Sequence, residues 1–197
     1  MNPARRAEVA RVTGETDVHL TLNVDGQGRW SIDTSVPFFD HMLSHVAVHA
    51  LFDLELTCRG DIAVDAHHTV EDVGIAFGQA LARALEDKHG IARYGQMLLP
   101  MDEALALVAL DFSGRGLLVY DAAPPAQQVG AFDSELTPEF LRALAHNAGM
   151  TLHVRLLSGG NTHHAIEAIF KALGRALGQA VIRDPRRQGV ASTKGVL

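Results

Sequence analysis

The stretch "GGNTHHAIEAIFKALGRAL" (residues 159–177) decides the fold, because "HHTVEDVGIAFGQAL" (residues 67–81) repeats its pattern earlier in the chain. The pairs that coincide at one offset are His67/His163, His68/His164, Glu71/Glu167, Gly78/Gly174, Ala80/Ala176 and Leu81/Leu177. Two further blocks recur in the same order: "TLNVDGQG" (21–28) resembles "ALDFSGRG" (109–116), and residues 37–57 resemble 136–156. The repeat indicates an ancient duplication, with one half at about 7–91 and the other at about 92–183.

Each half is expected to contain strand, turn, strand, helix, strand, loop and helix. Alternating hydrophobicity predicts strands at 17–24, 29–34 and 53–59, with counterparts at 105–112, 116–121 and 151–157. Helical periodicity predicts helices near 37–51, 67–88, 136–148 and 163–182. The turns "DGQG" and "SGRG" predict hairpins between the first two strands of each half. We therefore expect an α+β fold in which helices cover one face of each sheet and the two halves pack helix face to helix face.

The composition is that of an ordinary globular chain of 197 residues, 47% hydrophobic and 20% charged. The formal net charge of −6 does not favour nucleic acid or an anionic membrane as a partner. Cys58 is the single cysteine, which is typical of a chain in the reducing cytoplasm. The first twelve residues lack the apolar core of a signal peptide, and no apolar run approaches the roughly 20 residues of a membrane span.

The two HHxxE motifs have a geometry that suits metal binding. Asp65 is expected to cap one helix, and Asn161 or Thr162 the other, so that the histidines lie in the first turn. His67 and Glu71 are four residues apart and share a helix face, whereas His68 points about 100° away. A single motif of this kind could be a solvated helix face. Two copies predict two metal sites with ligands from both halves, of a mixed imidazole and carboxylate type that suits Mn, Fe or Zn, with manganese favoured for octahedral sites.

Five motifs together give the chain a resemblance to a known family. "FFDHMLSH", "DAHHTVEDVGIAFGQAL", "RYGQMLLPMDEALALVALDFSGRG", "NTHHAIEAIFKALGRAL" and "DPRRQGVASTKGVL" closely resemble the imidazoleglycerol-phosphate dehydratases. The resemblance implies a lyase of histidine biosynthesis that dehydrates D-erythro-imidazole glycerol phosphate to imidazole acetol phosphate. It also implies one domain over residues 1–197, of the ribosomal protein S5 domain 2-like kind, with a tail at about 184–197 that closes over substrate.

The resemblance further implies two Mn²⁺ ions per active site and a homo-oligomer of 24 subunits formed from trimers, with active sites at subunit interfaces. The ligands of one ion would be His41, His68, His163 and Glu167, and those of the other His67, Glu71, His164 and the residue at position 139. The family usually has histidine at that last position, whereas this chain has Glu139. The repeat places Glu139 opposite His41, and glutamate also binds Mn²⁺. His146 and His153 lie a helix turn or more away.

The implied reaction deprotonates the substrate's imidazole between the two metal ions, and the resulting imidazolate expels hydroxide. Glu15 is the candidate acid and base, with Glu71 and Glu167 as alternatives. The substrate-binding residues carried over are Glu15, His41, His49, His67, Arg93, Arg115, Lys171, Ser192 and Lys194. His45 has no clear role in this scheme. Two other functions remain open: a dinuclear metal-dependent phosphate-ester hydrolase, and a metal-storage cage that would need no phosphate-binding arginines.

Overall fold

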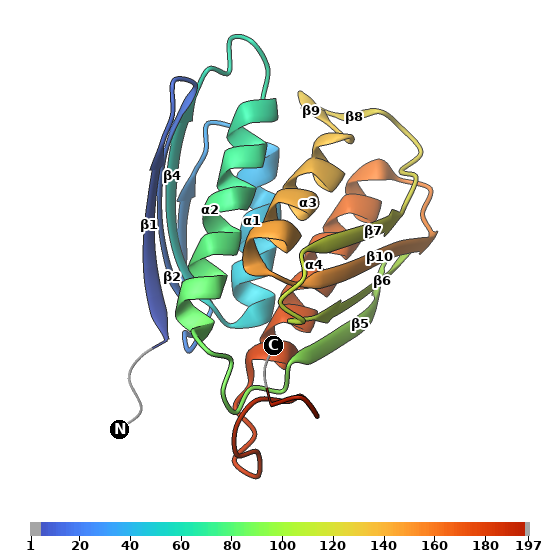
Figure 1. Cartoon of the computed structure of the whole chain (residues 1–197). Coiled ribbons are helices and arrows are strands. Elements are labelled where there is room, and N and C mark those ends of the chain that lie inside the picture. The colour runs from blue at the N-terminus through green and yellow to red at the C-terminus, as the bar shows by residue number, and fades with distance from the viewer. Residues whose placement is uncertain (1–4, 196–197) are drawn as a thin grey trace.

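The computed structural model describes residues 5–195 and contains two four-stranded sheets with four helices between them (Figure 1). The first half comprises β1 (Arg6–Val12), β2 (Thr16–Asn23), β3 (Trp30–Asp33), α1 (Pro37–Ala50), β4 (Asp53–Gly60) and α2 (His67–Leu85). The second comprises β5 (Tyr94–Met101), β6 (Ala104–Asp111), β7 (Leu117–Asp121), β8 (Gln128–Val129), β9 (Phe132–Asp133), α3 (Leu136–Ala148), β10 (Thr151–Ser158) and α4 (Thr162–Val181). The expected α+β fold of two duplicated halves is confirmed.

The two large sheets have the same topology, with strand orders β1-β2-β4-β3 and β5-β6-β10-β7. The hairpins predicted at "DGQG" and "SGRG" are wrong, because β2 and β3 flank β4 and do not pair with each other. In the second half, β6 and β7 likewise flank β10. At the start of β4, the Asp53 carboxylate accepts hydrogen bonds from the backbone N–H groups of Gln27 and Arg29. The turn after β2 thus lies at the N-terminal end of β4, and β3 runs parallel to β4.

The helices form the interior, with α1 and α2 against the first sheet and α3 and α4 against the second (Figure 1). The halves meet where α2 packs on α3 and α1 packs on α4. A Cβ atom built on Gly174 of α4 would lie 2.9 Å from the carbonyl oxygen of Val46, and one built on Gly78 of α2 would lie 2.7 Å from that of Leu144. The repeated glycine therefore sits at the close approach of the helices in both halves.

Three aromatic rings in mutual contact fill the centre of the helical layers. The ring of Phe39 meets that of Phe140 edge-on at 5.2 Å, and Phe140 stacks on Phe170 at 5.5 Å. All three side chains are fully buried and come from α1, α3 and α4. Burial of such rings dominates core energetics, so these rings hold the two halves together. Among residues 5–195, no helix combines the length and apolar composition that crossing a membrane requires.

Candidate metal centre

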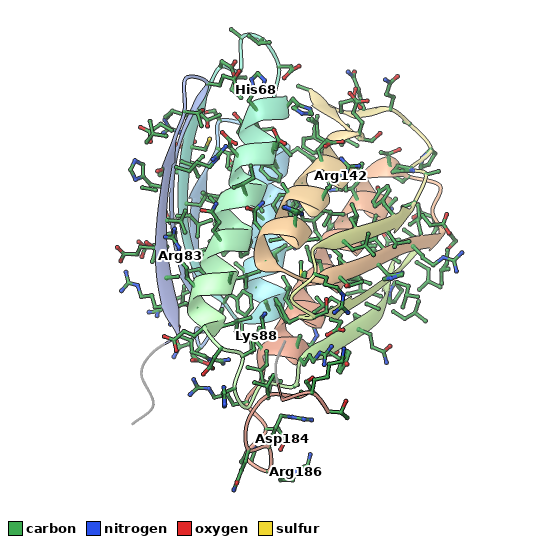
Figure 2. The ribbon with its side chains drawn as sticks, viewed as in Figure 1. His68, Arg83, Lys88, Arg142, Asp184 and Arg186 are labelled. Carbon is green, nitrogen blue, oxygen red and sulfur yellow. The ribbon has the colours of Figure 1, made fainter. Side chains whose placement is uncertain are left out.

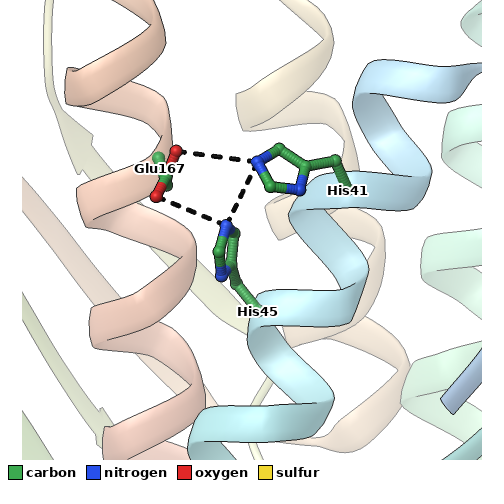
Figure 3. Close-up of side chains that lie close together, drawn as sticks. All are labelled: His41, His45 and Glu167. Atoms are coloured by element: carbon green, nitrogen blue, oxygen red, sulfur yellow. Dashed lines mark hydrogen bonds and ion pairs between the residues drawn. The ribbon is translucent and has the colours of Figure 1, made fainter.

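Glu167 of α4 is the buried centre of a polar cluster between α1 and α4. Its Oε2 lies 3.0 Å from Nε2 of His163 and 3.7 Å from Nε2 of His41, and its Oε1 lies 3.4 Å from Nε2 of His45. Lys171 places its Nζ 2.6 Å from Oε1. His163, Glu167 and Lys171 share one face of α4 because they are four residues apart. Figure 3 shows His41 and His45 reaching from α1 toward the same carboxylate.

The electrostatics of this cluster favour an ionised Glu167 beside a neutral His45. Burial would raise the pKa of Glu167, but the hydrogen bond from Lys171 and the neighbouring charges hold it below its usual value. Burial lowers the pKa of His45 to about 4, against the opposing effect of Glu167. Neutral imidazole and ionised carboxylate are the forms that bind cations. Glu167 and His45 are therefore in the protonation states that a divalent metal requires.

The donors of the cluster also fit a metal by distance and type. Among the described residues, His41, His45 and Glu167 are a set whose potential ligand atoms all lie within 4.8 Å of one another. Two imidazole nitrogens and a carboxylate oxygen suit a borderline cation such as Mn²⁺, Fe²⁺ or Zn²⁺. The residues present at this position therefore fit the predicted metal. His45 was missed as a member from sequence, although its spacing of four from His41 placed both on one face of α1.

The second histidine of each HHxxE motif is held by a carboxylate outside this cluster. Nδ1 of His68, at the start of α2 (Figure 2), lies 3.0 Å from Asp61, and its Nε2 lies 3.7 Å from Glu15. Nδ1 of His164 lies 2.8 Å from Glu103. These carboxylates raise the pKa of both histidines through hydrogen bonds, and the pKa of Glu103 is lowered to about 2.

The helix starts differ in how they are capped. Asn161 caps α4 as expected, since its side chain accepts a hydrogen bond from the backbone N–H of His164. Ala66, and not Asp65, is the residue before α2, and no side-chain bond caps it. The Asp65 carboxylate still accepts the backbone N–H of His67 at 2.8 Å. Both ends place their histidines in the first turn.

The chain brings together part of each predicted ligand set. His41, His163 and Glu167 are neighbours, whereas no hydrogen bond or ion pair within residues 5–195 joins His68 to them. For the other ion, Glu71 and Glu139 line one cavity of about 500 Å³ between α2, α3 and β7. His67 lies next to His68 at the start of α2, whereas His164 pairs with Glu103 in the second half. Glu139 forms an ion pair with Arg142 on the next turn of α3.

Besides His41, two further predicted substrate-binding residues lie close to the cluster. Lys171 contacts Glu167 directly, and the ring of His49 stacks at 5.9 Å on that of His45. Burial, Lys171 and Arg175 lower the pKa of His49. A histidine row along α1 thus faces a row of charged residues along α4.

The remaining predicted anion-binding residues lie on loops and on the C-terminal segment. The guanidinium of Arg93 pairs with Asp111 and donates to the backbone carbonyl of Ala191 at 2.6 Å. Arg115 is exposed in the turn before β7. The segment with Ser192 and Lys194 follows Ala191, so Arg93 ties that segment to the start of β5. Residues 196–197 of the predicted tail lie outside the described residues.

Comparison with known proteins matches the chain to a family model described as "Imidazoleglycerol-phosphate dehydratase" over residues 34–177. A protein of that name from Symbiobacterium thermophilum is 60% identical over 193 residues, which cover 98% of this chain and 93% of the relative. The same enzyme from Staphylococcus aureus has a crystal structure at 42% identity and a TM-score of 0.83, covering 91% of this chain and 99% of that one. A Pyrococcus furiosus structure in complex with (S)-C348 has 36% identity and a TM-score of 0.84, covering 96% and 100%.

Proposed function

The chain belongs to the imidazoleglycerol-phosphate dehydratase family of hydro-lyases, and on that premise we propose that it dehydrates D-erythro-imidazole glycerol phosphate to imidazole acetol phosphate in the cytoplasm. This step belongs to histidine biosynthesis. The observation that carries the proposal is the buried Glu167 with three histidines around it. This cluster suits a metal ion, and such an ion would lie beside the imidazole ring of the substrate.

Two Mn²⁺ ions per active site are part of the proposal. His41, His163 and Glu167 would hold one ion together with His68, and His67, Glu71, Glu139 and His164 would hold the other. The separation of His68 from Glu167 within one chain supports sites completed by neighbouring subunits. We therefore infer a homo-oligomer, of 24 subunits built from trimers. When bound, the metal would supply positive charge that stabilises negative charge on the substrate's ring.

The protein's own residues would orient the substrate and move its protons. Water forms from a hydroxyl and from a hydrogen on the neighbouring carbon, and the remaining enol tautomerises to the ketone. Glu15 is the proposed acid and base, because it is 56% exposed and lies 3.7 Å from Nε2 of His68. Glu71 and Glu167 are less suitable, since metal ligation lowers the basicity of a carboxylate. His49 would contact the substrate beside the cluster.

The phosphate of the substrate would be bound by positively charged side chains from α4, from loops and from the C-terminal segment. Lys171 is one helical turn from Glu167, so its ammonium can reach an anion near the ring. Arg93, Arg115, Ser192 and Lys194 would complete the phosphate site. Because Arg93 holds Ala191, we propose that the segment at about 184–197 closes over the phosphate while residues 1–197 form one domain.

A product assay on the metal-loaded protein tests this function. The dehydratase reaction yields a ketone that keeps its phosphate, whereas a dinuclear hydrolase would release inorganic phosphate. A metal-storage protein would form neither product, and Arg115→Ala would leave its metal content and assembly unchanged. For the dehydratase, Arg115→Ala is expected to raise KM with a smaller effect on kcat. Inorganic phosphate as the main product would contradict the proposal.

A further inference from the structure

In both halves, a carboxylate lies within hydrogen-bond distance of Nδ1 of the second histidine in the HHxxE motif. Nδ1 of His68 lies 3.0 Å from Oδ2 of Asp61, and Nδ1 of His164 lies 2.8 Å from Oε2 of Glu103. An ionised carboxylate can only accept a hydrogen bond, so the nitrogen facing it carries the proton. In the neutral imidazole the other nitrogen, Nε2, then carries the lone pair. In each ring this nitrogen faces a second, more distant carboxylate: Oε1 of Glu15 at 3.7 Å from His68, and Oδ2 of Asp102 at 3.8 Å from His164. A cation could bind between Nε2 and that carboxylate.

The two carboxylates come from different places in the repeat. Asp61 directly follows β4 in the first half, whereas Glu103 lies in the turn between β5 and β6. The position equivalent to Glu103 in the first half is Glu15, since each directly precedes the inner strand, β2 or β6. Carboxylates at two positions that are not equivalent in the repeat therefore contact the same ring nitrogen, Nδ1. This recurrence argues that the orientation of the imidazole ring is important for function.

Glu103 is also fixed by its own contacts. Its Oε1 accepts hydrogen bonds from the backbone N–H groups of Gly160 and Asn161, at 3.1 and 2.7 Å. Asn161 in turn caps α4 by accepting the N–H of His164. The carboxylate is thus rigidly placed before it meets the imidazole, and a purely local role in the turn would not require Oε2 to face the ring.

We propose that Asp61 and Glu103 are positioning residues that lock His68 and His164 in the tautomer and orientation that present Nε2 to a divalent cation. The inference rests on the proposed function, because it takes both histidines as metal ligands. A carboxylate behind a ligating histidine fixes the ring and raises its basicity, and removing such a partner typically costs 10–100-fold in metal affinity. Each carboxylate serves a different ion, so each should affect one site of the pair.

The test compares Glu103→Ala and Glu103→Gln with the full-length parent by Mn²⁺ equilibrium dialysis. Glu103→Ala should weaken one of two Mn²⁺ sites by about 10–100-fold. Glu103→Gln keeps one acceptor oxygen for the backbone N–H groups of Gly160 and Asn161, so it should fold like the parent. Its NH2 group would then face Nδ1 of His164 as a donor, so the Mn²⁺ affinity of that site should still fall. Asp87→Asn is the matched control, because Asp87 lies 2.8 Å from Nδ1 of His89, which is no proposed ligand.

A second readout separates positioning from a structural role in the turn. Solid-state NMR of the full-length protein labelled with ¹⁵N-histidine reports which nitrogen of His164 is protonated, with His164→Gln assigning the signal. The parent should carry the proton on Nδ1, and Glu103→Ala should shift it toward Nε2. Unchanged Mn²⁺ affinity and tautomer in both Glu103 variants would overturn the inference. A parent that binds no Mn²⁺ would instead defeat the proposed function.

Discussion

Nε2 of His41 lies 3.7 Å from Oε2 of Glu167, although the two residues belong to different halves of the duplicated chain. The contact crosses the packing of α1 on α4, which brings the first half's histidine to the second half's carboxylate. A metal at this position would therefore join the halves as well as serve the reaction. The cluster depends on the duplication, because neither half alone contains both residues.

Replacing Glu167 by glutamine should remove the charge on which the cluster is centred. We expect Mn²⁺ binding at one site to weaken by about 100-fold or more, since losing a ligand exceeds the loss of an outer partner. Dehydratase activity should fall with metal content, measured by elemental analysis of the purified protein. Glu135→Gln, at an exposed residue before α3, is the control. Two fully bound ions in Glu167→Gln would show that Glu167 is not a ligand.

Adding a methyl group at Gly174 should force α1 and α4 apart. The new Cβ would lie 2.9 Å from the Val46 carbonyl oxygen and 3.0 Å from Cβ of His49, closer than normal contacts. We expect Gly174→Ala to lower the free energy of unfolding by about 1–3 kcal/mol, as overpacking does. Gly14→Ala, where nothing lies within 4 Å, should change it little. Urea denaturation measures both, and equal stability of the two variants would contradict the close helix packing.

The metal-free protein should lose stability as the pH falls from 6.5 to about 4. The pKa of His45 is lowered to about 4 by burial, so in this window the unfolded chain binds a proton that the folded chain does not. The loss attributable to His45 is on the order of 3 kcal/mol at most. His45→Gln should show a shallower fall of the free energy of unfolding across that window. Identical pH dependence in parent and variant would show that His45 is not held neutral.

Glu139→His tests the proposed role of Glu139 as a metal ligand. If Glu139 only donates a ligand to Mn²⁺, histidine should preserve metal stoichiometry and change kcat/KM by less than about 10-fold, roughly 1.4 kcal/mol. The variant also breaks the ion pair with Arg142, so Arg142→Gln serves as the control for that loss. Complete inactivity with both ions still bound would assign Glu139 a role in the chemistry itself.

Most of the secondary structure could be predicted because each element carries a local pattern. The helices begin and end within a few residues of the expected bounds, as at α1 (Pro37–Ala50) and α3 (Leu136–Ala148). The first strand of each half, β1 and β5, was missed, and both are edge strands. In β5, Gly95 and Pro100 weaken the strand pattern and are tolerated because the strand lies at an edge. The parallel pairing of β3 with β4, and of β7 with β10, joins strands that a local turn pattern would pair as hairpins with their neighbours in sequence.

For the candidate site, the sequence predicts proximity only for residues that lie on one helix. The two HHxxE motifs identified His163 and Glu167 because their spacing of four is local to one helix. The place of His45 in the cluster and the Glu103–His164 pair depend on contacts between segments far apart in the chain. Sequence spacing contains no information about such contacts. The structure therefore adds to the candidate site the residues that surround its histidines.

The most direct test of the account is a paired measurement on the purified protein: Mn²⁺ bound per subunit and the product formed from imidazole glycerol phosphate. We expect two ions per subunit and a phosphorylated ketone, both lost together when the metal is removed and regained when Mn²⁺ is returned. Full formation of the ketone by protein stripped of metal would contradict the claim that the histidine–glutamate clusters act through bound cations.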